Sequence, residues 1–138
     1  MPSTEPTLPL GVLPDRSLSR EQMETLQAID RADLWFVEER LVGKAGATPK
    51  QARESIREFK RYMALVGLGY RGLGMASPLV DEAWHTFILF TKDYLAFCQA
   101  AFGEFIHHVP RTSRDPKTTE GTERFVRAYH EVFGDLSE

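Results

Sequence analysis

The chain has 138 residues, of which 42% are apolar and 27% are charged, so it is long enough to bury a core as one globular domain without disulfides or structural metals. Its net charge of −3 disfavours nucleic acid as the partner, and no apolar run approaches the roughly 20 residues that cross a bilayer, so we expect no membrane insertion. The single cysteine excludes an internal disulfide and a cysteine-rich zinc site, and together with the lack of a secretory signal pattern it favours a cytoplasmic location.

Residues 1–16 hold four of the eight prolines. Because proline fixes φ and lacks an N–H group, this composition predicts an extended proline-rich N-terminal arm. The helical domain is expected to span residues 17–138. Apolar side chains in the arm would let it pack on the surface of the domain, and a loose tail is the alternative.

Two helices are predicted in the first half of the domain. The first begins near Ser17 or Ser19, of which Ser19 matches a capping box with Gln22. Apolar residues recur at helical spacing as far as Leu41. The second begins at Thr48-Pro49, a hydroxyl cap followed by proline at the first helical position. It carries the clearest apolar stripe of the chain, formed by Ala52, Ile56, Phe59, Met63 and Val66.

Four basic residues lie beside that stripe: Arg53, Arg57, Lys60 and Arg61. Glu54 and Glu58 alternate with them at the spacings of ordinary helix ion pairs, so we interpret the basic residues as a solvated face. A surface for an acidic partner is the alternative. A nucleic-acid surface is disfavoured because acidic residues are interleaved.

The second half begins with a glycine-rich stretch at residues 67–74, which lacks the pattern of a phosphate-binding loop and is interpreted as a flexible connection. Ser77-Pro78 starts a strongly apolar helix that is expected to run to about Ala101 and to end at Gly103. A polar loop then leads to a last short helix, which starts near Thr122. No alternating pattern of strand length occurs, so the predicted fold class is all-α, a compact bundle of about four to five helices.

The polar residues able to carry chemistry gather in and after the long apolar helix. Asp81 and His85 stand four positions apart and therefore share one face. We expect them to hydrogen-bond to each other and to tie this helix to the loop that carries His107 and His108. Such a pair can orient an imidazole for acid–base work or metal ligation, or it can be a structural hydrogen bond.

A metal site is one hypothesis for this cluster. Two histidines and a carboxylate suffice for a divalent transition metal with open coordination positions. The candidate ligands are Asp81, His85 and His108, with His107 as the alternative loop histidine. One loop histidine could instead cap the end of the long helix. The sequence predicts no cofactor, and the divalent transition metal is the alternative.

Cys98 is predicted to be structural. On a straight helix the thirteen residues from His85 to Cys98 rotate the side chain by roughly 220°, so the two face apart. Trp84 and Cys98 share a face to within about 40°, and we expect both in the core with Ile88 and Leu95. Free cysteine is commonly buried as a small hydrophobe.

A longer pattern joins these residues along the chain: Val80-Asp81, Trp84-His85, Tyr94, Phe97-Cys98, His107-His108 and Pro110. It resembles an uncharacterised bacterial family of helical domains, and its Val-Asp-x-x-Trp-His core is similar to one in plant glycine-rich-domain proteins. The resemblance covers about positions 35–134 and adds Tyr94 to the candidate polar site. Many relatives carry a second histidine where this chain has Phe87, so a metal site that uses that position is not available here.

Two functions from different classes remain open. A small, soluble, mildly acidic helical domain with a proline-rich arm suits a non-enzymatic protein-interaction module, with Trp35 or Tyr70 as an aromatic anchor. This is the preferred prediction, and it implies a protein partner that the sequence does not identify. The alternative is a metal-binding or acid–base enzyme that uses Asp81, His85 and His107 or His108, although no recognised catalytic motif occurs. The sequence predicts no oligomeric state.

Overall fold

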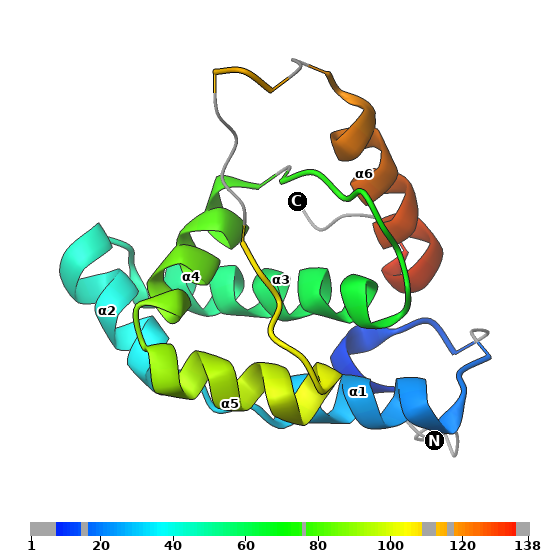
Figure 1. Cartoon of the computed structure of the whole chain (residues 1–138). Coiled ribbons are helices and arrows are strands. Elements are labelled where there is room, and N and C mark those ends of the chain that lie inside the picture. The colour runs from blue at the N-terminus through cyan, green and yellow to red at the C-terminus, as the bar shows by residue number, and fades with distance from the viewer. Residues whose placement is uncertain (1–7, 15–16, 76, 109–112, 116–117, 135–138) are drawn as a thin grey trace, which may run out of the picture.

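The computed structural model of the chain describes residues 8–14, 17–75, 77–108, 113–115 and 118–134. These residues form helices and no strand, so the all-α prediction is confirmed. In chain order the helices are the 3₁₀ turn η1 (Pro9–Gly11), α1 (Arg20–Arg31), α2 (Trp35–Ala45), α3 (Pro49–Gly67), α4 (Pro78–Ile88), α5 (Thr91–Phe102) and α6 (Glu120–Phe133) (Figure 1). The described residues therefore hold six α-helices instead of the predicted four to five, because two of the predicted helices are each broken in two.

α3 is the central element of the fold. It packs against α1, α2, α4 and α6, and Figure 1 shows it running behind α4 and above the row formed by α1 and α5. Thr48 caps this helix as predicted, because Gln51 N–H donates to Thr48 Oγ1 over 3.1 Å. Thr48 N–H also donates to Gln51 Oε1 over 2.9 Å, which completes a capping box that was not predicted. Phe59 from its apolar stripe is buried against the rings of Trp84, Phe87 and Phe97.

The first predicted helix ends early, at Arg31, and a new helix starts at Trp35. Lys60 of α3 explains the end, because its ammonium donates to the carbonyls of Asp30 and Ala32 over 3.1 and 2.6 Å. These are carbonyls at the end of α1 that a continuing helix would have used. Asp33 Oδ1 then accepts from Trp35 N–H at the start of α2. A side chain from a distant helix therefore sets this break.

The predicted long helix from Ser77 to Ala101 is also wrong, because it breaks at Leu89-Phe90. No glycine or proline marks the break. Phe90 instead leaves helical geometry, with φ −90° and ψ 72°, and its ring lies 4.8 Å from that of Phe36 in α2. Packing between helices has overridden local helix propensity here.

Residues 8–14 of the predicted arm lie against the domain. Val12 is buried, and Leu13 N–H donates to the carbonyl of Val132 in α6 over 2.8 Å. Leu10 has a left-handed φ of 61°, and Arg61 Nε donates to its carbonyl over 3.0 Å. The interpretation of Arg61 as part of a solvated face is therefore wrong, because its side chain is only 9% exposed. The boundary between arm and domain stays a prediction.

The glycine-rich stretch is tied to α6 rather than standing apart from it. Gly74 N–H donates to the carbonyl of Gly121 over 2.8 Å, and Arg124 Nε donates to the carbonyl of Gly72 over the same distance. A Cβ at Gly74 would lie 2.8 Å from backbone atoms of Gly121, so only glycine allows this close approach. α6 then buries Phe125, Tyr129, Val132 and Phe133 along its inner face.

None of the helices formed by the described residues combines the length and the apolar character of a membrane span.

Candidate metal centre

α4 carries the first part of the site. Ser77 caps this helix, its Oγ accepting from Val80 N–H, and Pro78 occupies the first turn as predicted. Asp81 and His85 follow on consecutive turns of one face. Trp84 lies between them in sequence and is buried. The helix therefore places two ligand-type side chains at the surface and one indole beneath them.

Tyr94 of α5 fixes the segment that follows that helix. Its side chain is 1% exposed, and its hydroxyl accepts from Trp84 Nε1 over 3.0 Å and donates to the carbonyl of Ile106. Burial raises the pKa of Tyr94, so the hydroxyl keeps its proton for that bond at neutral pH. The result is a buried hydrogen-bond chain from α4 through α5 to residue 106.

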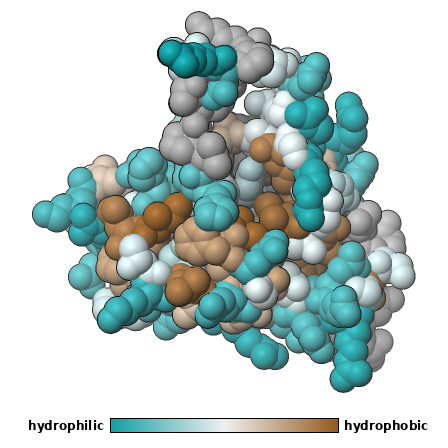
Figure 2. Space-filling view, in the orientation of Figure 1, coloured by the Kyte–Doolittle hydropathy of each residue, from teal (hydrophilic) through white to brown (hydrophobic). Residues whose placement is uncertain are grey.

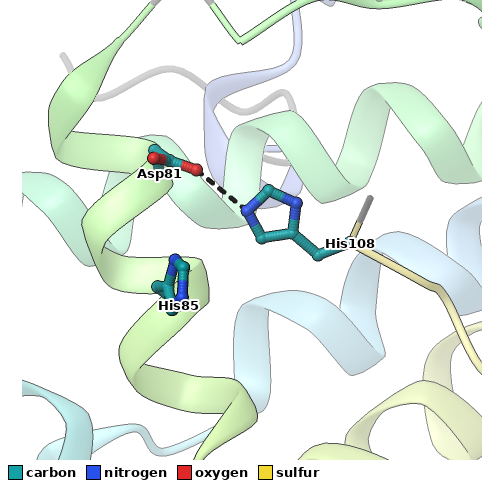
Figure 3. A group of neighbouring side chains, drawn as sticks. All are labelled: Asp81, His85 and His108. Atoms are coloured by element: carbon teal, nitrogen blue, oxygen red, sulfur yellow. Dashed lines mark hydrogen bonds and ion pairs between the residues drawn. The ribbon is translucent and has the colours of Figure 1, made fainter. Parts of the chain in front are cut away.

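His108 completes the cluster. Its ring stacks on the indole of Trp84, with centroids 4.4 Å apart and an interplanar angle of 16°. Its Nε2 lies 2.8 Å from Asp81 Oδ1, and its ring meets that of His85 edge-on at 5.8 Å. Figure 3 shows Asp81 and His85 projecting from successive turns of α4 while His108 faces them from the segment after α5.

The predicted hydrogen bond between Asp81 and His85 is wrong. Asp81 pairs with His108 instead, and it is this pair that ties α4 to the loop. The helix places Asp81 and His85 on one face, and His108 approaches Asp81 from the segment after α5. His85 is left exposed beside them.

The remaining candidates lie apart from the cluster. His107 is exposed and its ring contacts Phe105, with centroids 4.8 Å apart. Cys98 is fully buried in the core and lies beside Tyr94. The expectation that Leu95 would share this part of the core is wrong, because Leu95 is exposed. The break at Leu89-Phe90 also removes the straight helix on which the Cys98 orientation was calculated.

The donor atoms of Asp81, His85 and His108 all lie within 4.8 Å of one another. Two imidazoles and one carboxylate form a ligand set used by zinc and by non-haem iron. The side chain of His108 is 12% exposed and that of Asp81 is 47% exposed, so the cluster has one buried and held ligand and two accessible ones. A metal bound there would face solvent on the outer side.

Sequence reasoning missed how Trp84 and Tyr94 support the site. The indole supplies the surface on which His108 stacks, and the phenol holds the adjoining backbone. Trp84 stands three positions after Asp81, so its place next to the face of that carboxylate could have been inferred from helix geometry. The pairing of Tyr94 with residue 106 had no signal in sequence spacing.

No curated protein and no solved structure matches the chain. A model of the UCP032817-like family matches residues 33–132. This range includes all three residues of the cluster, together with Trp84 and Tyr94, and covers most of the chain. The chain therefore belongs to the uncharacterised UCP032817-like family.

Proposed function

We propose that this domain binds one divalent transition-metal ion through Asp81, His85 and His108. The observation that carries the proposal is the convergence of one carboxylate and two imidazoles from separate segments, with donor atoms within 4.8 Å. The geometry supports this alternative better than the interaction module that the sequence favoured.

Small side-chain movements would complete the coordination. Ligand distances of about 2.1 Å in a tetrahedral site place donor atoms roughly 3.4 Å apart. The 2.8 Å contact between Asp81 and His108 would have to lengthen slightly, and His85 would have to approach. His85 is free to do so because it is exposed, whereas His108 is held on Trp84. One fixed and one adjustable imidazole suit reversible binding.

Three protein ligands leave at least one coordination position for water or another small ligand. Structural zinc sites are closed by four protein ligands, whereas sites with three keep an open position. The ring of His108 is restricted in its movement by the stack on Trp84, and the indole is held in turn by its buried hydrogen bond to Tyr94. The proposal therefore favours a reactive or exchangeable metal over a purely structural one.

Isothermal titration with Zn²⁺ tests the proposal. We expect the unaltered protein to bind one ion per chain and His85→Ala to lose at least tenfold in affinity. His107→Ala is the matched control, because His107 is the sequence neighbour of His108 but lies outside the cluster. Equal losses in both variants, or no stoichiometric binding by the unaltered protein, would overturn the proposal.

We retain the protein-interaction module as a second candidate because two large apolar side chains are unusually exposed. Trp35 is 61% exposed and Leu89 is 60% exposed. Trp35 directly precedes Phe36 in the sequence, and Leu89 directly precedes Phe90. The rings of Phe36 and Phe90 are in contact with each other. Figure 2 shows apolar side chains gathered in a band across the face in view, between hydrophilic regions. Exposed aromatic anchors of this kind dominate many interfaces.

Analytical ultracentrifugation of a purified partner complex tests this second candidate. A complex that forms with the unaltered chain and is lost with Trp35→Ser supports it, and a complex unaffected by Trp35→Ser contradicts it. Tyr70, the other predicted anchor, is half-buried and donates from its hydroxyl to Glu131. The likeness to plant glycine-rich-domain proteins and the cytoplasmic location stay predictions.

A further inference from the structure

A second polar region lies on α3, on residues distinct from those of the histidine cluster. A pocket of about 440 Å³ opens between η1, the end of α1 and α3. Its walls carry four cationic side chains, Arg53, Arg57, Lys60 and Arg61, and one carboxylate, Asp30. Leu10 and Ile56 supply apolar surface in the same pocket.

Arg61 is the most constrained of these cations. Its side chain is 9% exposed, Nε donates to the carbonyl of Leu10, and Nη1 donates to the hydroxyl of Tyr129 over 2.5 Å. The nearest carboxylate, Glu58, is 3.9 Å away and accepts from that same hydroxyl. Among the described residues Nη2 has no hydrogen-bond partner, and it lies so close to Gly11 that a Cβ there would be 2.6 Å from it. None of the residues that the structure describes therefore supplies an acceptor for this buried guanidinium nitrogen at the pocket wall.

Lys60 and Arg57 add unmatched charge. The Lys60 ammonium uses two of its three N–H groups on backbone carbonyls, which carry no full charge. Burial lowers the pKa of Lys60, and the carboxylates of Asp30 and Asp33 only oppose this effect. Arg57 forms no hydrogen bond or ion pair with any residue that the structure describes, and Arg53 has only a 3.8 Å pair with Glu38. The pocket therefore has more positive charge than its own residues neutralise.

We propose that this pocket binds a small soluble phosphate monoester. Arg53, Arg57 and Arg61 follow one another at four-residue intervals along one face of α3. Guanidinium groups match phosphate oxygens through paired N–H donors, which a point charge cannot do. A dianionic phosphate would accept hydrogen bonds from Arg61 at the pocket wall and from the exposed guanidinium of Arg57. The organic part of the ester would contact Leu10 and Ile56.

Isothermal titration with phenyl phosphate tests the proposal, at about 0.1 M salt to screen long-range attraction. We expect binding of one molecule per chain, weaker binding of inorganic phosphate and none of phenol. Arg57→Gln should weaken phenyl phosphate binding at least tenfold, since Arg57 contributes charge but no contact that holds the fold. Arg127→Gln is the matched control, because Arg127 is exposed on α6 and does not line the pocket.

Three results would overturn the phosphate proposal. The first is binding that Arg57→Gln leaves unchanged, and the second is an equal loss in Arg127→Gln, which would show attraction by net charge alone. The third is binding to vesicles that contain phosphatidic acid without binding of phenyl phosphate, which would assign the cations to a lipid surface. His85→Ala should leave phenyl phosphate binding intact, so this test is independent of the metal proposal.

Discussion

The histidine cluster on α4 and the cationic pocket on α3 differ in how far the chain satisfies its own polar groups. In the cluster, the Asp81 carboxylate and the His108 imidazole partner each other, and the Trp84 indole supports the ring. In the pocket, four cations face one carboxylate, and Arg57 has no partner among the described residues. The cluster is therefore partly paired within the chain, whereas the pocket leaves positive charge that its own described residues do not neutralise.

This contrast separates residues that hold the fold from residues that are available for binding. Arg61 and His108 are both held by several contacts, and each belongs to a proposed site. Arg57 and His85 are exposed members of the same sites. Substitution of a held member should lower stability and binding together, and substitution of an exposed member should lower binding alone.

The largest expected effect on stability is that of Arg61→Ala. It removes a buried guanidinium that bonds Leu10 and Tyr129 and lies 4.9 Å from the centre of the Phe133 ring. Loss of one partner from a buried charged network typically costs about 3–5 kcal/mol. Urea denaturation measures this change in the free energy of unfolding. Arg57→Ala should stay within about 0.5 kcal/mol of the unaltered protein, and similar losses in both variants would remove the distinction between held and exposed cations.

Tyr94→Phe should cost about 1–3 kcal/mol, because it leaves Trp84 Nε1 and the Ile106 carbonyl without their shared partner. The same variant should change how the stability of the fold depends on pH in the alkaline range. The pKa of Tyr94 is raised in the folded state, so its contribution is complete below the unfolded value of about 10 and is lost as pH rises above it.

Burial also raises the pKa values of Tyr62 and Tyr129. The unaltered protein should therefore lose stability above pH of about 10, and Tyr94→Phe should lose less over the same range. Thermal unfolding followed by circular dichroism across this range checks both statements. If Tyr94→Phe lost stability more steeply than the unaltered protein as pH rises, the assignment of this loss to Tyr94 would be contradicted.

His108→Ala should cost about 1–2 kcal/mol, since it removes the stack on Trp84 and a hydrogen bond whose carboxylate is partly screened by solvent. His85→Ala should change stability by less than about 0.5 kcal/mol. Chemical denaturation of the two variants without added metal provides the comparison. A larger loss in His85→Ala would show that the exposed imidazole holds the fold and that the cluster is structural.

Local signals in the sequence predicted much of the secondary structure. Ser19, Thr48 and Ser77 accept the cap bonds expected of them, and Gly103 takes the left-handed conformation that ends α5. These features depend on residues within one helical turn. The breaks before Trp35 and at Phe90 do not, because Lys60 and Phe36 act from other helices. The sequence therefore predicted the helix caps, but it did not predict the contacts between helices at these two breaks.

For the candidate site, too, the local features were predictable from the sequence and the contacts between distant segments were not. The four-residue spacing of Asp81 and His85 places them on one face of a helix, and the structure has them so. The loop histidine that joins them is His108, whose ring stacks on the indole of Trp84, while His107 lies beside Phe105. Tyr94 bonds the carbonyl of Ile106, just before the two histidines. No periodicity in the sequence carries that information.

Histidine ring resonances in a long-range ¹H–¹⁵N spectrum, recorded as Zn²⁺ is added, test the metal proposal most directly. The proposed site predicts that the rings of His85 and His108 change together and saturate at one ion per chain, while the ring of His107 keeps its free spectrum. Changes that spread over His107 as well, or that fail to saturate at one equivalent, would contradict a metal site made by Asp81, His85 and His108.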